Sequence, residues 1–303
     1  MVLGRLWSML NDLGGSFVPH LQRAPADALA YASAGPLLPG EPMPATRWGR
    51  DRVNVVDSLW VDGSIFPDGQ QETLRLARPL ALSKASSLLL LGAGTDGPPC
   101  CITSQLGAWV TGFEADPELV LVATERSLRA GFGRRAEIKT WDPTDPGFSR
   151  RNYHHALALE ALRGQAPGPV LAALFNAMQP AGQLVKVDLV AEQPLDPLDD
   201  AVMVWCRLEG RPSVVPRQRA ISAALGRLGF DVRVTEDISL RHMQQAMQGW
   251  HNVIRGMGGK KPTPAMAMTV VREAEPWPRR LSLMRARLIR LVRWHAIRED
   301  TPM

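Results

Sequence analysis

Residues 87–99 have the sequence SLLLLGAGTDGPP and constrain the fold more than any other stretch of this 303-residue chain. Four consecutive leucines that end in a glycine turn are typical of a strand buried on both faces, as at the centre of a parallel sheet. Gly92 and Gly94 permit a tight turn whose backbone N–H groups approach a ligand. Pro98 and Pro99 suit the first turn of a helix. A strand, a glycine turn and a helix N-terminus together predict a site for an anionic or nucleotide-like ligand.

Strand patterns and helix patterns alternate regularly after this turn. Asp116 is followed by Pro117 and Glu118, an order typical of a helix N-cap with a carboxylate near the positive helix end. Regular alternation of strands and helices predicts βαβ units with right-handed crossovers, and therefore one doubly wound parallel sheet within about residues 50–240. The expected parallel strands are residues 88–91, 108–114, 136–141, 153–159 and 182–190.

Helices are expected before the first strand. Residues 1–15 form an amphipathic pattern with Leu3, Leu6, Trp7 and Leu10 on one face. Residues 33–46 hold four prolines and two glycines, which is typical of an irregular linker. Two further helices are expected at residues 53–61 and 69–82.

The C-terminal part predicts helices and the last strands of the sheet. Residues 230–237 alternate as a strand does, and residues 240–257 have a helical stripe. From Trp277 a second helical stripe gives way, near Leu288, to a strand pattern. We therefore divide the chain into an N-terminal helix and linker (1–50), a core (51–240) and a basic C-terminal part (241–303) that completes the sheet.

Charge and cysteine content restrict the location and the partners. The net charge of +5 is concentrated in residues 241–300, which hold twelve Lys and Arg against four Asp and Glu. Cys100, Cys101 and Cys206 have neither metal-ligand spacing nor a disulfide framework, and no run of about eighteen apolar residues is present. We expect a cytoplasmic protein without a metal site, with peripheral attachment to a membrane as an alternative.

The glycine turn is compatible with several nucleotide cofactors. Gly92, Gly94 and Gly97 occupy the first, third and sixth positions of the dinucleotide pattern. Glu114 ends the second strand about twenty residues later, where a carboxylate accepts hydrogen bonds from ribose hydroxyls. This pattern alone fits NAD, FAD and S-adenosylmethionine.

Several motifs follow one another in an order that points to one family. They are GSIFPDGQQETLRL (63–76), LLLLGAGTDGPP (88–99), VTGFEAD (110–116), Trp141-Asp142-Pro143, ALEAL (158–162) and QPAGQLVKVDLV (179–190). In this order they resemble the motifs of class I S-adenosylmethionine-dependent methyltransferases, and the first resembles a segment of the branch that acts on small molecules and lipid head groups. The resemblance implies a Rossmann-like, seven-stranded sheet with five parallel strands and an antiparallel end, and S-adenosylmethionine as cofactor.

The resemblance also implies roles for individual residues. Gly92 and Gly94 would approach the methionine part of the cofactor, together with Asp96 and Gly97 of the same turn. Glu114 would bind the ribose, although an ordinary carboxylate at a strand end is the alternative. Asp142 would lie near the adenine amino group, and a turn-forming role before Pro143 is its alternative.

Three positions depart from the family pattern. Leu90 replaces an acidic residue in the first strand, Asp96 replaces a glycine, and His154 replaces an aspartate. A carboxylate of Asp96 about 4 Å from the methionine carboxylate would cost ~1 kcal/mol if solvated and ~4 kcal/mol at an effective dielectric near 20. Asp96 would avoid this cost by turning outward to cap the helix, or by accepting a hydrogen bond from the cofactor's ammonium group.

Candidates for a catalytic base are His154, His155 and Glu160. The two histidines are consecutive in a strand, so they face opposite sides and at most one reaches a cleft. Structural packing is the alternative for both, and an ordinary charge at a helix start is the alternative for Glu160.

Two functions are consistent with these features. The first is methyl transfer from S-adenosylmethionine to a small-molecule or lipid-like acceptor. The second is a catalytically degenerate scaffold or assembly subunit that docks on a protein or an anionic membrane surface through a basic segment containing Arg280, Arg287 and Arg290. A nicotinamide enzyme is a third alternative, and a nucleic-acid substrate is disfavoured because aromatic residues are not interleaved with the basic cluster.

Overall fold

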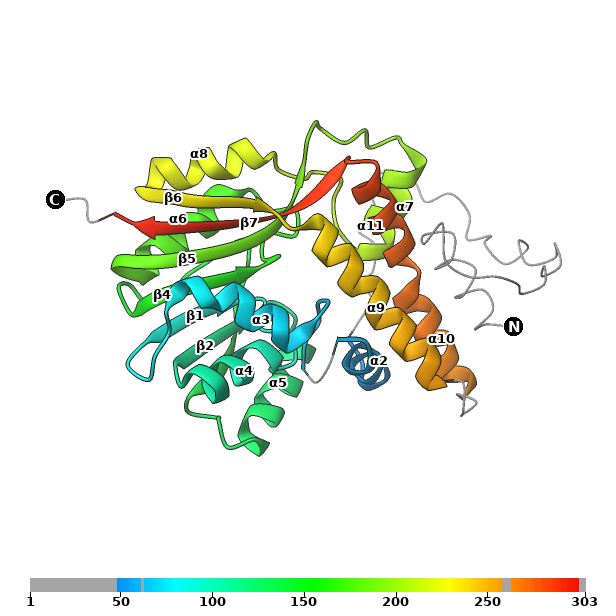
Figure 1. The fold of residues 1–303 in the computed structure, drawn as a ribbon, viewed down its shortest axis with the longest axis horizontal. Helices are drawn as coiled ribbons and strands as arrows, with labels where there is room; N and C mark the ends of the chain where they lie inside the picture. Colours follow the sequence, from blue (N-terminus) through cyan, green and yellow to red (C-terminus); the bar gives the residue numbers. More distant parts are fainter. Residues whose placement is uncertain (1–47, 61–62, 258–262, 300–303) are drawn as a thin grey trace.

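A mixed sheet of seven strands forms the centre of the part of the chain that the structure describes, residues 48–60, 63–257 and 263–299 (Figure 1). In this computed structural model the strand order is β3-β2-β1-β4-β5-β7-β6. Neighbours from β3 to β5 are parallel, whereas β7 is antiparallel to both β5 and β6. The predicted doubly wound sheet with an antiparallel end is therefore confirmed. The strands are β1 (Ser87–Leu91), β2 (Trp109–Glu114), β3 (Ala136–Thr140), β4 (Tyr153–Leu159), β5 (Met178–Ala191), β6 (Phe230–Asp237) and β7 (Ile289–Arg298).

Helices cover both faces of the sheet and form a further layer beside it (Figure 1). On one face lie α3 (Gly69–Ala77), the short 3-10 helix η2 (Arg78–Leu80), α4 (Gly97–Leu106) and α5 (Pro117–Arg129). On the other lie α6 (Pro167–Ala177) and α8 (Gln218–Leu228). The additional helices are α2 (Arg50–Trp60), α7 (Asp200–Glu209), α9 (Ser239–Met257), α10 (Pro264–Ala274) and α11 (Pro276–Arg285).

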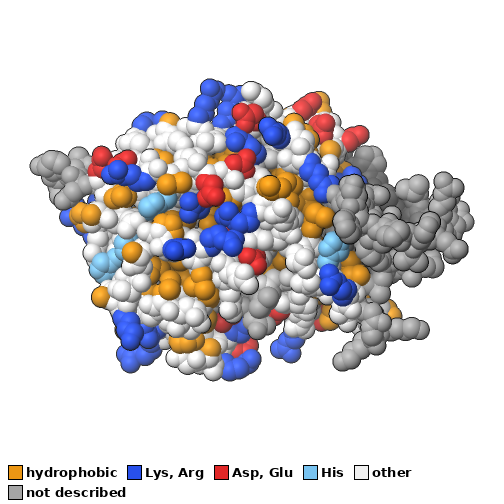
Figure 2. Space-filling model, in the orientation of Figure 1, with side chains coloured by type: hydrophobic (Ala, Val, Ile, Leu, Met, Phe, Trp, Pro, Cys, Tyr) orange, Lys and Arg blue, Asp and Glu red, His pale blue; other side chains and the backbone are white. Residues whose placement is uncertain are grey.

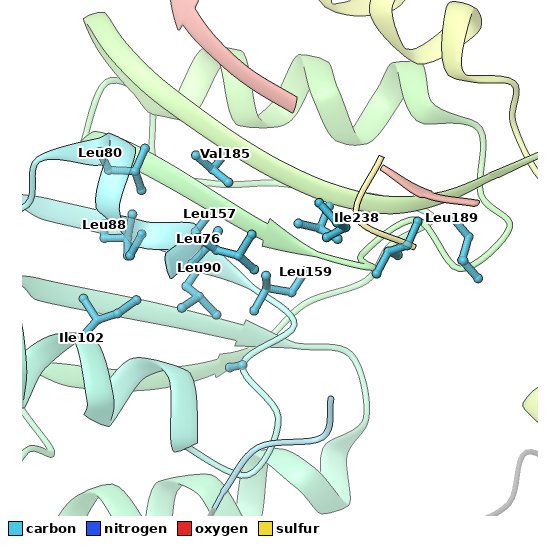
Figure 3. Packing of buried hydrophobic residues seen from close by; sticks show 14 of the residues in the cluster. Leu76, Leu80, Leu88, Leu90, Ile102, Leu157, Leu159, Val185, Leu189 and Ile238 are labelled. Atoms are coloured by element: carbon cyan, nitrogen blue, oxygen red, sulfur yellow. The ribbon is translucent and has the colours of Figure 1, made fainter. Parts of the chain in front are cut away.

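The four leucines of β1 occupy the core on both faces of the sheet, and all four have no exposed surface. Leu88 and Leu90 pack under α3 and η2, where Leu76 points onto the sheet (Figure 3). Leu89 and Leu91 face the opposite cluster, which includes α6 and α8. The alternation of side chains along a strand explains why a continuous apolar run is needed here.

A separate hydrophobic cluster joins α2, α9, α10 and α11 beside the sheet (Figure 1). Its centre is Trp60, whose ring centroid lies 5.0 Å from that of Trp277 and 6.4 Å from that of Trp250. Large aromatic rings bury much apolar surface, so they fix the position of this layer. The layer forms one wall of the cavity described below.

The structure differs from the sequence expectations at several places. The strand expected at residues 182–190 begins earlier, at Met178, and contains a bulge where the register with β4 shifts and Ala181 has a φ of 58°. The helices α7 and α10 were not predicted. The expected helix at 1–15 and linker at 33–46 lie outside the described residues. The strand expected after Leu288 is confirmed as β7, which is inserted between β5 and β6.

The basic residues expected to form a docking segment do not share one exposed face. Arg280 is buried, and Arg290 forms ion pairs with Glu192 and Asp237. Acidic and basic side chains are interspersed over the face shown in Figure 2. Within the described ranges, the structure contains no helix of the length and apolarity that a membrane span requires.

Candidate functional site

The glycine turn after β1 is held by hydrogen bonds to two other segments. Gly92 donates its N–H to the carbonyl of Phe113 at 3.0 Å. Thr95 and Gly97 donate theirs to the carbonyl of Gly63, at 3.1 and 2.9 Å. Backbone N–H groups that the sequence assigns to a ligand are therefore already paired within the protein. The segment that begins at Gly63 lies directly against the turn.

Glu114 connects the end of β2 to the same turn. One carboxylate oxygen accepts from the N–H of Gly94 at 3.1 Å, and the other accepts from Ala115 at 2.9 Å and Asp116 at 3.3 Å. The side chain is 5% exposed. Burial raises the pKa of Glu114, while Arg163 and the three N–H donors act in the opposite direction. A carboxylate held this firmly is pre-oriented for a ligand at the carboxyl edge of the sheet.

Asp96 lies in the left-handed region with a φ of 96°, at the start of α4. Its carboxylate accepts a hydrogen bond from the Cys100 thiol at 3.3 Å and makes no side-chain cap to the helix. Burial, and next the charge of Asp96, raise the pKa of Cys100 to about 12. Asp96 lines a hollow together with Asp57 and Arg126, and it does not line the cavity beside Gly92.

An ion pair between α2 and α5 also contacts the glycine turn. Arg126 donates both terminal nitrogens to the carboxylate of Asp57, at 3.0 and 2.5 Å, and one of them also to the Thr95 hydroxyl at 3.1 Å. Asp57 in turn accepts from the N–H of Gly63 at 3.0 Å. This clamp was missed by sequence reasoning because its members are far apart in the chain and share no motif.

A cavity of about 120 Å³ lies where β1, β4 and β5 end, between the sheet and the helices α3, α9 and α11. Gly92 and Glu160 contribute to its floor, and Ile65, Phe66 and Leu76 contribute to an apolar wall. Its polar lining consists of Glu72, Glu160, Arg163, Arg241, His242, Gln245 and Arg280. A concave, largely apolar site with a few charged groups at the carboxyl ends of parallel strands is typical of a ligand pocket.

The carboxylates of the cavity are paired with arginines. Arg280 donates to Glu160 at 2.5 Å and lies 3.5 Å from Glu209. Burial would raise the pKa of Glu160, but the positive charge of Arg280 beside it outweighs burial and lowers the pKa to about 2. Arg241 forms a two-pronged contact with Glu72, at 3.0 and 3.2 Å. Glu160 is therefore an ionised partner of Arg280.

His242 is the cavity residue that is hardest to expect from the sequence, because a single histidine in a helix carries no signal. It is 6% exposed, and its ring lies against Trp277 with centroids 5.8 Å apart. Its Nε2 has no hydrogen-bond partner among the described residues. Burial, and next the charge of Arg280, lower the pKa of His242 to about 3, so its ring is neutral at physiological pH.

The structure brings some of the expected site residues together and separates others. Gly92, Gly94, Glu114 and Glu160 lie at the carboxyl edge of the sheet. Asp142 follows β3 at the same edge, and its carboxylate accepts from the N–H and the hydroxyl of Thr144 at 2.8 and 2.7 Å. Both hydrogen bonds lower the pKa of Asp142, and the bond from the hydroxyl has the larger effect.

His154 and His155 lie at the amino end of β4, away from the cavity. The Nδ1 of His154 accepts from the N–H of Ser87, the first residue of β1, at 3.0 Å. The Nδ1 of His155 accepts from the N–H of Gln183 at 3.2 Å. Strands β1 and β4 are parallel, and both run from this edge toward the cavity. Each imidazole is therefore hydrogen-bonded to the backbone at the edge of the sheet that lies away from the cavity.

Lowering the pH below 6.5 is expected to destabilise the protein through His242 by ~1.4 kcal/mol per pH unit. The pKa of about 3 in the folded state lies below its ordinary value of 6.5, so the unfolded chain binds the proton first as pH falls. Urea unfolding at pH 7 and pH 5.5 measures the slope. His242→Gln should reduce the slope by up to one proton. Equal slopes in wild type and His242→Gln would contradict a buried neutral ring.

No protein-family model and no curated protein matches the chain. Solved structures do match. Phosphoethanolamine N-methyltransferase 2 of Haemonchus contortus, in complex with phosphomonomethylethanolamine and S-adenosylhomocysteine, has a TM-score of 0.71 and 14% identity over 83% of this chain and 58% of its own. The [4+2]-cyclase SpnF has a TM-score of 0.59 and 18% identity, covering 83% and 94%. Geranyl diphosphate C-methyltransferase of Streptomyces coelicolor has a TM-score of 0.57 and 12% identity, covering 75% and 78%.

These similarities establish the fold. The chain has the seven-stranded, Rossmann-like fold of class I methyltransferases, and it spans 58% of the length of the Haemonchus enzyme. The presence of a cyclase among the matches shows that one fold serves more than one reaction. The function must therefore be argued from the residues of the site.

Proposed function

We propose that this chain binds S-adenosylmethionine at the carboxyl edge of β1 and β2 and transfers its methyl group to a small-molecule or lipid-like acceptor in the adjoining cavity. The observation that carries the proposal is Glu114, a buried carboxylate at the end of β2 that is fixed to the glycine turn through Gly94. A carboxylate at this position of a doubly wound sheet suits the two hydroxyls of a ribose.

The residues present fit this cofactor. Glu114 would accept from the ribose, and Asp142 at the same edge would lie on the adenine side. The carbonyl of Gly63 already accepts hydrogen bonds from N–H groups of the turn. A different group must therefore bind the amino-acid end of the cofactor. Arg163 is suited to this role. It lines the cavity, its charge opposes the burial that raises the pKa of Glu114, and its side chain makes no hydrogen bond or ion pair within residues 48–60, 63–257 and 263–299. Its guanidinium would pair with the cofactor's carboxylate.

The cofactor would supply an activated methyl group, and the protein would supply orientation and a water-poor site. The apolar wall that includes Phe66 and Leu76 would exclude water from the acceptor. The pairing of Glu160 with Arg280 keeps that carboxylate ionised and in place, so it contributes a fixed negative charge near the acceptor. We assign no step of the transfer to His154 or His155.

Glu114→Gln is expected to weaken binding of S-adenosylhomocysteine about 100-fold, because the amide can no longer accept from both ribose hydroxyls and one charge-assisted hydrogen bond is worth ~1.5–3 kcal/mol. Isothermal titration calorimetry measures the affinity, and thermal unfolding verifies that the variant is folded. Glu118→Gln is the matched control and should bind the ligand as wild type does. Glu118 is an exposed carboxylate in the first turn of α5.

The same titration distinguishes the proposed enzyme from a scaffold. No detectable heat from wild type at millimolar ligand would contradict the proposal and favour the degenerate scaffold. Binding that is equally strong in Glu114→Gln would place the cofactor elsewhere. Binding of NADH in place of the sulfonium cofactor would favour a nicotinamide enzyme.

A further inference from the structure

Two buried nitrogens in the cavity lining have no hydrogen-bond partner among the described residues. They are Nε2 of His242 and Nε of Arg280. His242 is 6% exposed and Arg280 is 8% exposed. Buried polar atoms in native proteins are almost always paired, with protein groups or with ordered water, so these two nitrogens are available to a ligand or a water molecule. The two side chains are also electrostatically coupled, because Arg280 lowers the pKa of His242.

The two nitrogens require complementary partners. Nε of Arg280 always carries a proton and can only donate. His242 is neutral, and the positive charge of Arg280 beside it favours the tautomer in which the unpaired Nε2 carries a lone pair. A hydroxyl group is both a donor and an acceptor, whereas an ammonium group has donors only. Of these two groups, only the hydroxyl complements both nitrogens.

The two carboxylates that line the cavity offer little to a cationic acceptor, because both are already paired with arginines. Glu160 pairs with Arg280, and Glu72 pairs with Arg241. An amine arrives as an ammonium ion at neutral pH, so it would have to compete with these arginines for the same carboxylates. A neutral hydroxyl requires no such competition.

The remaining walls are apolar. Ile65, Phe66, Leu76, Ile238 and Leu291 face the cavity and supply a surface for a hydrocarbon or aromatic body. A ligand that buries this body would gain free energy in proportion to the apolar area removed from water. The site therefore combines one polar end with an apolar wall.

We infer that the cavity binds an apolar alcohol or phenol whose hydroxyl group hydrogen-bonds to His242, and that it discriminates against amines of the same shape. This inference rests on the proposed function, because it names the class of acceptor for that site. His242 is here a residue that binds and orients the acceptor hydroxyl.

Benzyl alcohol, benzylamine and toluene form a matched series for the test, because they differ only in the terminal group. Each is titrated into the full-length protein saturated with S-adenosylhomocysteine, and side-chain nitrogen NMR signals of His242 report on occupancy. Benzyl alcohol is expected to bind at least tenfold more tightly than either analogue and to shift the His242 signals.

Variants at position 242 show whether this side chain is responsible. His242→Leu is expected to lower the affinity for benzyl alcohol to that for toluene. His242→Gln retains a hydrogen-bonding group and should preserve much of the preference. If the leucine variant does not fold, His242→Phe replaces it, because phenylalanine keeps a ring beside Trp277 without a ring nitrogen. His251→Leu, on the same helix but outside the cavity lining, should bind like wild type.

The outcomes separate this inference from the proposed function. If S-adenosylhomocysteine binds but benzylamine binds as tightly as benzyl alcohol, the inference is wrong and the proposed function stands. The same holds if none of the three probes binds, or if His242→Leu, or His242→Phe in its place, leaves the preference unchanged. If wild type does not bind S-adenosylhomocysteine, the proposed function itself is wrong.

Discussion

Arg280→Met is expected to lower the free energy of unfolding by about 3–5 kcal/mol, because it removes one partner of a buried charge network. The guanidinium lies 2.5 Å from Glu160 and 3.5 Å from Glu209, and Arg280 is 8% exposed. Without it, two carboxylates remain in a poorly hydrated site with less compensating charge. Urea unfolding at pH 7 measures the loss.

An exposed ion pair of the same length provides the control. Arg129 lies 2.5 Å from Glu125 on α5, with both side chains more than 60% exposed. Arg129→Met should cost no more than ~1 kcal/mol, because water and salt screen exposed charges. Adding Glu160→Gln to Arg280→Met should restore part of the lost stability, since it removes one uncompensated charge. Equal losses for Arg280→Met and Arg129→Met would contradict the buried network.

Most of the sheet could be predicted because its signals are local. The run Leu88 to Leu91 needs no distant information to indicate a strand buried on both faces. Asp116 predicted a helix start in the same way, and its carboxylate accepts from the N–H groups of Glu118 and Leu119 as expected. The strand expected at residues 182–190 starts earlier, at Met178, because Met178 already pairs with Tyr153 of β4; a bulge follows, and regular pairing resumes at Gln183.

The site could be predicted only where its residues follow one strand-turn-helix unit. Gly94 and Glu114 are separated by one such unit, and the structure joins them directly. His242 and Arg280 reach the cavity from helices that follow the core, so no spacing rule connects them to the glycine turn. The ion pair between Asp57 and Arg126 joins residues 69 positions apart, and tertiary packing alone brings its charges together.

The histidines of β4 illustrate a different difficulty. His154 and His155 are candidates by residue type, but they are the second and third residues of a strand whose other end faces the cavity. In a parallel sheet, ligands bind at the carboxyl ends of the strands. Position along the strand therefore says more about access to the site than side-chain chemistry does.

Gly97→Ala is expected to destabilise the protein by about 3 kcal/mol, even though alanine is the better helix former by ~1 kcal/mol. A Cβ on Gly97 would lie 2.6 Å from the backbone carbon of Gly63 and 2.7 Å from the backbone nitrogen of Ser64. Backbone atoms cannot rotate away as a side chain does. The segment must therefore move off the turn, and the bonds from Thr95 and Gly97 to the Gly63 carbonyl would be lost.

Gly168→Ala is the matched control, because Gly168 also lies in the first turn of a helix, but a Cβ added to it would meet no atom of the described residues within 4 Å. It should leave stability unchanged or raise it by up to ~1 kcal/mol. Urea unfolding of both variants separates crowding from helix propensity. If Gly97→Ala were as stable as Gly168→Ala, the segment at Gly63 would not lie against the turn. If Gly97→Ala is destabilised and also binds S-adenosylhomocysteine more weakly, the packing of Gly63 on the turn supports the cofactor site as well as the fold.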